Sequence, residues 1–277
     1  MDKHEPAARK RYGQHFLHDP AVLARMVASV EPAPDDRLLE IGPGTGALTP
    51  TLLERVPRLH AVEIDRRLVA HLRSLYGTDR LALLECDARD VDITALANHL
   101  GQRVRVVGNL PYNISTPLLF HCLGHAAAIQ DLHVLLQREV VLRMIARPST
   151  PEYGRLTVTV ASCAKAESLF EVGPGAFRPP PEVRSRWVRL VPYRSEPFPG
   201  AWDQAFADVV AAAFQKRRKT LANALRPLLL KEEIQAVGLD PQLRAENLTP
   251  PDYGKLARAI SFLRTHPEHK MRGSEPS

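Results

Sequence analysis

The sequence has few cysteines and no long apolar run, and each absence excludes a class of protein. Its three cysteines, Cys86, Cys122 and Cys163, are odd in number, widely spaced and outside any pairing motif, which argues against a disulfide framework and favours a reducing compartment. No stretch approaches the roughly 18 apolar residues of a membrane span, and the charged N-terminus lacks the apolar core of an export signal. We therefore expect a cytoplasmic protein that is neither exported nor bound to a membrane.

Acidic residues are missing where basic residues gather. The formal net charge is +6, and no acidic residue lies between Asp208 and Glu232. One such cluster is commonly only a solvated face, but three clusters in one chain favour a nucleic acid partner. The three clusters are Arg9, Lys10 and Arg11; Arg178, Arg184, Arg186 and Arg189, relieved only by Glu182; and Lys216, Arg217, Arg218, Lys219, Arg226 and Lys231.

The length and the composition are compatible with two folded domains. The chain has 277 residues, of which 44% are hydrophobic, enough for a large core and a smaller one. The prolines and the glycine of 192–200 resemble a linker. We predict a catalytic domain over 1–195, a helical domain over 200–265 and a disordered tail over 266–277.

Short apolar runs alternate with helical patterns between 38 and 136, which indicates a mostly parallel sheet wrapped by helices. Two later runs would complete seven strands as an antiparallel pair at the edge, giving a Rossmann-like α/β fold followed by a small all-helical domain. The segment 156–163 is ambiguous between strand and helix. The predicted strands are Leu38–Ile41, Leu59–Ile64, Leu81–Cys86, Val104–Val107, Leu132–Leu136, Ser168–Val172 and Trp187–Val191.

Helix starts are marked by capping residues followed by proline. Asp19-Pro20 predicts a helix that runs to about Val30, and Thr116-Pro117 predicts another. Three helices are expected in the C-terminal domain, over Trp202–Phe214, Thr220–Leu230 and Tyr253–Leu263.

A glycine-rich turn follows the first predicted strand. Glycines stand at the first, third and fifth positions of Gly42-Pro43-Gly44-Thr45-Gly46, whereas a dinucleotide site needs glycines at the first, third and sixth. The spacing favours S-adenosylmethionine over a nicotinamide cofactor, although a turn without any ligand also fits the pattern.

Two carboxylates follow the next two predicted strands. Glu63 lies 21 residues after Gly42 and can accept both hydroxyl hydrogens of a ribose. Asp87 can accept a hydrogen bond from an adenine amino group. Either acid alone could be a helix cap or a surface charge, but together they support a nucleoside-containing cofactor.

The stretch Asn109-Leu110-Pro111-Tyr112 offers what methylation of an exocyclic amine requires. The Asn109 side chain and the Leu110 carbonyl can accept both hydrogens of the amine, which draws the nitrogen toward tetrahedral geometry. Tyr112, together with Phe177, could sandwich the flipped base. Without the cofactor motifs, an ordinary proline turn with Tyr112 in the core would be the simpler interpretation.

Several motifs together resemble the ribosomal RNA adenine dimethyltransferase family. The resemblance covers about residues 8–265, and its C-terminal motifs are similar to those of the small-subunit branch, the kasugamycin-sensitivity methyltransferases. The motifs are Lys10-Arg11-Tyr12-Gly13-Gln14-His15-Phe16-Leu17, the glycine turn, 109–117, 177–185, 214–221 and 244–248.

The resemblance implies N6,N6-dimethylation of two adjacent adenosines in the 3′-terminal hairpin of small-subunit rRNA, by a late factor of subunit assembly. At position 15 the family more often has asparagine, and at position 12 phenylalanine. The catalytic set is Asn109, Leu110, Tyr112 and Phe177. The cofactor set is His15, Leu17, Gly42, Gly44, Glu63, Asp87, Ala88 and Asn109. The RNA-binding set is Arg9, Lys10, Arg11, Arg178, Lys216, Arg217, Arg218 and Lys219.

Alternatives remain open at this stage. A large-subunit rRNA methyltransferase shares the catalytic motifs, a non-catalytic assembly factor could share the RNA-binding ones, and a nicotinamide oxidoreductase could use the glycine turn. His121 and His125 have helical spacing but no third ligand motif, so we expect no metal. Nothing in the sequence indicates an obligate oligomer, and a monomer is expected.

Overall fold

The computed structural model describes residues 6, 8–9, 13–216 and 218–266, and the chain divides into two compact units. The first unit comprises Met1–Val141 and Ala166–Pro192, and the second comprises Leu142–Lys165 and Tyr193–Ser277. The segment 142–165 therefore belongs with the second unit, whereas the sequence prediction placed it in the first domain. Of the predicted tail, residues 267–277 lie outside the described part of the chain.

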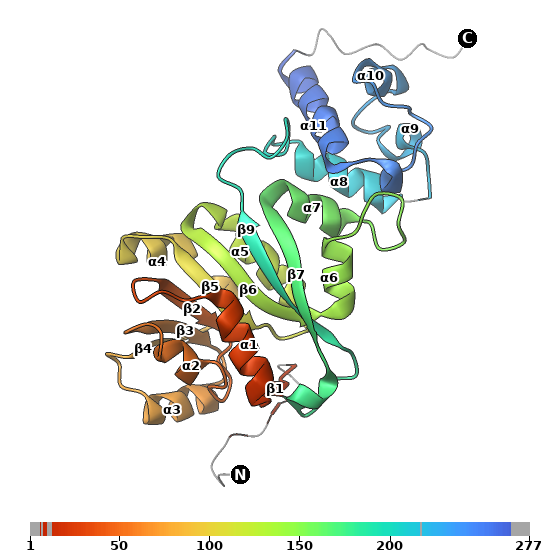
Figure 1. Cartoon of the computed structure of the whole chain (residues 1–277). Coiled ribbons are helices and arrows are strands. Elements are labelled where there is room, and N and C mark those ends of the chain that lie inside the picture. The colour runs from red at the N-terminus through yellow and green to blue at the C-terminus, as the bar shows by residue number, and fades with distance from the viewer. Residues whose placement is uncertain (1–5, 7, 10–12, 217, 267–277) are drawn as a thin grey trace, which may run out of the picture. The chain divides into compact units, whose positions relative to one another are not determined.

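A seven-stranded sheet forms the centre of the first unit. Its strand order is β4-β3-β2-β5-β6-β9-β7; the pairs from β4 to β6 are parallel and β9 is antiparallel to β6. The predicted mostly parallel seven-stranded fold is confirmed (Figure 1). The strands are β2 (Arg37–Ile41), β3 (Leu59–Glu63), β4 (Leu81–Glu85), β5 (Val104–Asn109), β6 (Ile129–Gln137), β7 (Ala164–Val172) and β9 (Ser185–Pro192).

Strand order reverses between β2 and β5, and this reversal positions the site. The chain runs outward from β2 through β3 to β4, then returns to the other side of β2 for β5. Ligands of such folds bind beyond the carboxyl ends of the strands at this switch point. The glycine turn follows β2, Glu63 is the last residue of β3, Asp87 lies two residues after β4, and Asn109 is the last residue of β5.

Helices cover both faces of this sheet, with α1 in front of it and α5 behind it in Figure 1. Asp19 caps α1 as predicted, accepting hydrogen bonds from the amides of Ala21 and Val22. Thr116 is not the cap of α5: the helix begins at Ser115, whose hydroxyl bonds back to the Tyr112 carbonyl at 3.2 Å. The helices are α1 (Pro20–Val30), α2 (Thr49–Leu53), α3 (Arg66–Leu75), α4 (Ile93–Leu100), α5 (Ser115–Gly124) and α6 (Arg138–Met144).

A separate two-stranded sheet joins two distant motifs. Strand β1 (Phe16–Leu17) pairs antiparallel with β8 (Phe177–Arg178). The sequence did not predict this pairing. It holds the motif around His15 against the proline-rich loop that follows Phe177.

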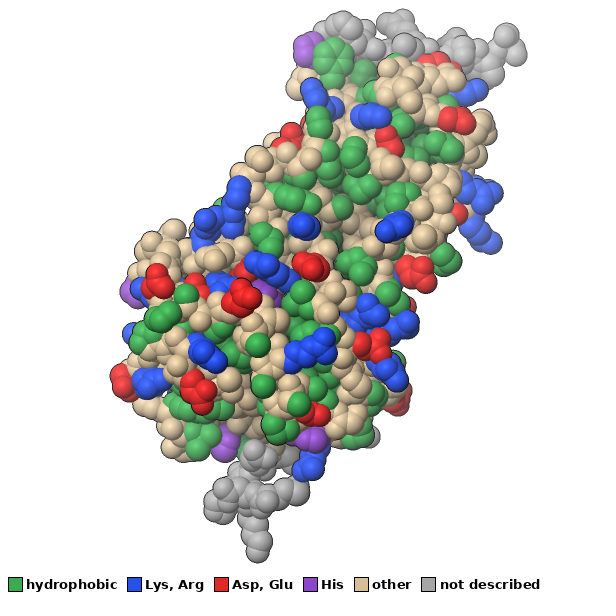
Figure 2. Space-filling model, in the orientation of Figure 1, with side chains coloured by type: hydrophobic (Ala, Val, Ile, Leu, Met, Phe, Trp, Pro, Cys, Tyr) green, Lys and Arg blue, Asp and Glu red, His purple; other side chains and the backbone are tan. Residues whose placement is uncertain are grey.

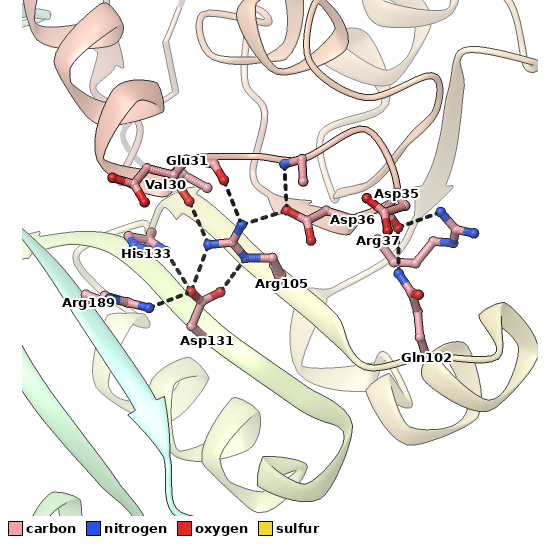
Figure 3. A network of polar contacts seen from close by, with 11 residues as sticks. Val30, Glu31, Asp35, Asp36, Arg37, Gln102, Arg105, Asp131, His133 and Arg189 are labelled. Carbon is pink, nitrogen blue, oxygen red and sulfur yellow. Dashed lines mark hydrogen bonds and ion pairs between the residues drawn. The ribbon is translucent and has the colours of Figure 1, made fainter.

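A buried polar network fastens α1 to the sheet. Arg105 of β5 is 6% exposed and uses all its donors: Nε and Nη2 bond Asp131, Nη1 bonds Asp36 and the Glu31 carbonyl, and Nη2 also bonds the Val30 carbonyl. Figure 3 shows this side chain between the end of α1 and the start of β6. Buried cations of this kind are stable only when they are fully paired.

The second unit is helical and has its own core. The ambiguous segment 156–163 is helical, because Val158 and Val160 of α7 are buried and Thr157 Oγ1 accepts from the Gly154 amide at 3.1 Å. The predicted helix 220–230 is much shorter, since Pro227 cannot continue it. The helices are α7 (Arg155–Cys163), α8 (Phe206–Gln215), α9 (Leu221–Ala224), α10 (Lys231–Ala236) and α11 (Pro250–Thr265).

Candidate active site

A cavity of about 260 Å³ opens at the carboxyl ends of β2 to β5. Four predicted site segments and the His15 motif meet there, although they are far apart in sequence. The lining includes His15, Gly42, Gly44, Glu63, Asp87, Ala88, Asn109, Leu110 and Tyr112.

The glycine turn forms the floor of this cavity. Gly42 and Gly44 have φ angles of 65° and 62°, which glycine adopts without strain. A Cβ on Gly44 would approach the Phe16 ring to 3.1 Å. The turn therefore depends on glycine both for its backbone conformation and for its packing against the His15 motif.

Glu63 is held rigidly by backbone amides. Its Oε1 accepts from Ile64 and Asp65 at 2.9 Å each, and its Oε2 accepts from Gly44 at 3.2 Å. Burial raises the pKa of this carboxyl, and the amide hydrogen bonds oppose that rise. Because each carboxylate oxygen can accept two hydrogen bonds, Oε1 is fully used and Oε2 can accept one more hydrogen bond, such as that of a ribose hydroxyl.

A second buried carboxyl beneath the turn was missed by the sequence analysis. Glu40 is 1% exposed and accepts a hydrogen bond from Thr49 Oγ1 at 2.8 Å. Burial raises its pKa to about 7. The only sequence feature that could have indicated this role is the position of Glu40 two residues before Gly42. The hydrogen bond with Thr49 links the strand before the glycine turn to the start of α2.

Asp87 points its carboxylate at a neighbouring arginine. Oδ2 lies 2.6 Å from Arg89 Nη2, and the Arg89 amide donates to Oδ1 at 2.9 Å. The hydrogen bond from Arg89 holds the pKa of Asp87 below its usual range. Arg89 also lines the cavity, so any ligand group that bonds Asp87 shares this carboxylate with the guanidinium.

The Asn109 amide is oriented by the opposite wall of the cavity. Its Nδ2 donates to the His15 carbonyl at 2.9 Å, which leaves Oδ1 as the free acceptor. Gly108 allows this position, because a Cβ there would meet the Ile41 carbonyl at 2.4 Å. The sequence analysis did not single out Gly108.

Tyr112 is anchored at its hydroxyl and stacked on His15. The hydroxyl bonds Ser185 Oγ at the start of β9, and burial raises the pKa of the phenol. The His15 ring lies 5.4 Å from the Tyr112 ring at an interplanar angle of 27°. His15 Nδ1 donates to the Pro179 carbonyl at 2.8 Å, so the imidazole bridges Tyr112 and the proline-rich loop.

Phe177 does not reach the cavity. It is 2% exposed and packs in the core with Leu17, because the pairing of β1 with β8 turns both side chains inward. The prediction that Phe177 stacks on the base is therefore wrong for this conformation. Leu17 lines a smaller adjoining hollow together with Gly42, Gly44 and Asn109.

The predicted RNA-binding residues fall on both units. Arg178, Lys216, Arg218 and Lys219 are exposed, and Arg9 is partly buried. Lys10, Arg11 and Arg217 lie outside the described residues. Each unit therefore carries exposed basic side chains from the predicted set.

The two helical histidines have other partners. His121 Nε2 bonds the Val91 carbonyl at 2.9 Å, and His125 Nδ1 bonds Thr94 Oγ1 at 2.8 Å. Within the described ranges, no group of three or more His, Cys, Asp or Glu side chains could hold a metal ion. No helix in the same ranges is long and apolar enough to cross a membrane.

Comparison with known families identifies the class of this protein. The model of the ribosomal RNA adenine dimethylase family matches residues 6–261. The chain belongs to this family. As a family member it is an rRNA adenine dimethyltransferase that uses S-adenosylmethionine as methyl donor. The nicotinamide oxidoreductase and the non-catalytic assembly factor are thereby excluded.

Curated relatives of the dimethylase chain match it over nearly its whole length. A protein of Methylococcus capsulatus is 50% identical over 94% of this chain and 99% of its own. One of Acidithiobacillus ferrooxidans is 46% identical over 92% and 95%. Both are named ribosomal RNA small subunit methyltransferase A.

Two solved methyl- or dimethyladenosine-transferase structures share the dimethylase fold. A dimethyladenosine transferase from Plasmodium falciparum superposes with a TM-score of 0.71 at 25% identity, covering 87% of this chain and 96% of its own. The 23S rRNA methyltransferase ErmE gives a TM-score of 0.68 at 24% identity, covering 89% and 99%. The second likeness concerns the fold alone.

The cavity of the dimethylase has space and hydrogen-bond acceptors that fit S-adenosylmethionine. Glycines at positions 42 and 44 leave room for a ligand near the backbone, and Glu63 and Asp87 present acceptors at the ends of adjacent strands. These residues fit a ligand with a ribose and an aminopurine.

We expect Glu63→Gln to weaken S-adenosylhomocysteine binding by about 10- to 100-fold, since hydrogen bonds to a charged group contribute roughly 1.5–3 kcal/mol. Isothermal titration calorimetry measures the effect. Glu54→Gln, a change of an exposed glutamate at the C-cap of α2, is the control. Equal affinity of Glu63→Gln and wild type would remove Glu63 from the cofactor site.

Proposed function

We propose that this protein dimethylates N6 of two adjacent adenosines in the 3′-terminal hairpin of small-subunit rRNA, late in subunit assembly in the cytoplasm. The observation that carries the substrate assignment is near full-length identity of 46–50% to small-subunit methyltransferases. The proposal includes action as a monomer without a metal ion.

The cofactor residues hold the methyl donor in the cavity. Glu63 accepts a hydrogen bond from a ribose hydroxyl through Oε2, and Asp87 accepts one from the adenine amino group. The Ala88 amide and the backbone of Gly42 and Gly44 make the remaining contacts. When bound, S-adenosylmethionine supplies an electrophilic methyl group attached to a positively charged sulfur. His15 contributes through its carbonyl, which fixes Asn109.

The acceptor residues orient a weak nucleophile. Asn109 Oδ1 and the Leu110 carbonyl accept the two hydrogens of the adenine amine, so the nitrogen lone pair turns toward the methyl donor. Orientation and matched electrostatics then lower the barrier. A strong general base is unnecessary, because the proton can leave after the methyl group has arrived.

Tyr112 provides the stacking surface for the flipped adenine. Its ring is fixed by Ser185 and supported on one face by His15, and the other face is proposed to take the base. Such a stack contributes roughly 1–3 kcal/mol. Phe177 would join the stack only after leaving the core, so Tyr112 is the principal contact in the proposed site.

The basic residues after α8 are proposed to grip the rRNA backbone. Alanines at Lys216, Arg217, Arg218 and Lys219 should weaken subunit binding and lower the slope of log affinity against log salt by about 0.7–0.9 per lost phosphate contact. The control replaces Lys255 and Arg264 of α11, whose charges pair with Asp252 and Asp208. If the slope of log affinity against log salt equals that of wild type, these four residues do not contact the rRNA backbone.

The decisive test of the function is chemical mapping. The protein and labelled S-adenosylmethionine are incubated with small subunits from a strain that lacks this methylation, and in parallel with large subunits. We expect label on two adjacent adenosines of small-subunit rRNA, with two methyl groups on each. Label on the large subunit instead would favour the antibiotic-resistance type of activity.

A further inference from the structure

Three arginines of the first unit surround one carboxylate, that of Glu171 on β7. Arg184 Nη1 lies 2.5 Å from Oε1, while Arg138 Nε and Arg186 Nη2 lie 3.4 and 3.6 Å from Oε2. We call Arg138, Arg184 and Arg186 the arginine cluster. Counting Glu171, the group has a net charge of +2. Figure 2 shows Lys and Arg side chains, with Asp and Glu among them, over the visible face of the molecule.

The arginine cluster has more donors than its neighbours use. Only the Arg184 contact has hydrogen-bond length, since the other two ion pairs exceed 3.2 Å. Arg186 Nη1 donates to Ser168 Oγ at 3.1 Å, but its buried Nε has no hydrogen-bond partner. Hydrogen bonding from Arg184 keeps the pKa of Glu171 below its usual range. The carboxylate is thus ionised at neutral pH and holds the cations without neutralising them.

The arginine cluster lies at the same edge of the sheet as the cavity. Ser185, between Arg184 and Arg186, bonds the Tyr112 hydroxyl. The Arg138 amide donates to the Arg184 carbonyl at 2.9 Å, which joins the end of β6 to the start of β9. Gln137 of β6 pairs with Ser185, so the arginine cluster and the cavity that Tyr112 lines share the carboxyl edge of the parallel strands.

We propose that the arginine cluster binds a backbone phosphate of the rRNA next to the adenosine being methylated. This inference rests on the proposed function and adds a phosphate site to it. A nucleotide whose base is turned into the cavity must leave its flanking phosphates at the rim, and the guanidinium fork matches phosphate oxygens in bidentate fashion. Glu171 keeps the three side chains converged before RNA binds. An ordinary solvated ion network is the rival explanation.

The test compares two pairs of arginines that each share one carboxylate. In Arg138→Ala/Arg184→Ala the KM for small subunits lacking this methylation should rise about tenfold or more. The slope of log KM against log salt should fall by about 1.4, that is about 0.7 for each single-strand phosphate contact. The control, Arg66→Ala/Arg73→Ala, removes two arginines that pair with Glu85 on β4, at the opposite edge of the sheet.

Three readouts separate the possible failures. S-adenosylhomocysteine affinity and kcat within about twofold of wild type show that the fold and the cavity are intact. Arg138→Lys/Arg184→Lys retains the charges and should recover most of the salt slope. A KM and slope equal to those of the Glu85 control, with an active wild type, overturn the phosphate site. Absence of methylation by the wild type would instead overturn the proposed function.

Discussion

Replacing Asn109 by alanine should reduce the methylation rate by on the order of a hundredfold or more, which is the usual effect of removing one preorganised polar group from an active site. The change removes the Oδ1 acceptor and also the Nδ2 donor that bonds the His15 carbonyl. The adenine amine then loses the contact that turns its lone pair, and the His15 carbonyl loses its partner. The methylation rate therefore falls for two reasons: the adenine amine is no longer oriented, and the His15 side of the cavity is held less firmly.

The measurement is single-turnover methylation of small subunits that lack the modification, together with a filter-binding affinity for the same subunits. RNA binding should stay within about threefold of wild type, because Asn109 is one contact among many. Asn98→Ala, on the exposed face of α4, controls for the loss of an amide at the surface. A rate near that of wild type would sink the proposed mechanism even if the substrate assignment stands.

Replacing Arg105 by methionine should destabilise the first unit by about 3–5 kcal/mol, the range found when one partner of a buried ion pair is removed. Asp131 would be left 1% exposed without its main cation. Its other neighbours compensate poorly: Arg189 approaches only to 3.5 Å, and burial lowers the pKa of His133 to about 4, so His133 is neutral at pH 7. The carbonyls of Val30 and Glu31 would also lose their donor.

Urea unfolding followed by Trp187 fluorescence measures this effect in the first unit. Trp187 is buried there and donates to Ser29 Oγ of α1 at 2.8 Å, while a Trp202→Phe background silences the other tryptophan. The double variant Arg105→Met/Asp131→Leu should regain part of the lost free energy of unfolding, because the buried charge of Asp131 is no longer present without its cation. Recovery is incomplete because Asp36 and the carbonyls of Val30 and Glu31 still lack their partner Arg105. A single variant as stable as wild type would show that the network contributes little.

Most of the catalytic sheet could be predicted from local patterns. The strands from β2 to β6 are short apolar runs, which can be recognised in the sequence. Their ends could be predicted from motifs at or just after them, such as Gly42 after β2 and Asn109 at the end of β5. The cavity lining follows from the same logic, since parallel strands deliver their carboxyl ends to one edge. This is why residues separated by about a hundred positions could be assigned to one site.

Features that depend on long-range contacts could not be predicted. A strand of two residues is too short to leave a recognisable sequence pattern, so β1 and β8 were not predicted. For the same reason Phe177 was assigned to the cavity, whereas it lies in the core. The Thr and Val residues of α7 favour a strand locally, yet packing in the second unit makes the segment helical. The place of 142–165 in the second unit was not predicted for the same reason, because the burial of Tyr153 and Val158 in the second core is not visible in the sequence.

The position of β9 has a consequence for synthesis of the chain on the ribosome. This strand pairs with the free edge of β6 but ends 55 residues later, at Pro192 against Gln137. At a synthesis rate of roughly 5–20 residues per second, the edge of β6 stays unpaired for about 3–11 s before β9 has been made. Most of that edge is apolar in the finished fold, with Leu132, Val134 and Leu135 buried, and unpaired apolar edges invite association with other chains. We expect nascent chains stalled within this interval to be the aggregation-prone species and the preferred clients of chaperones.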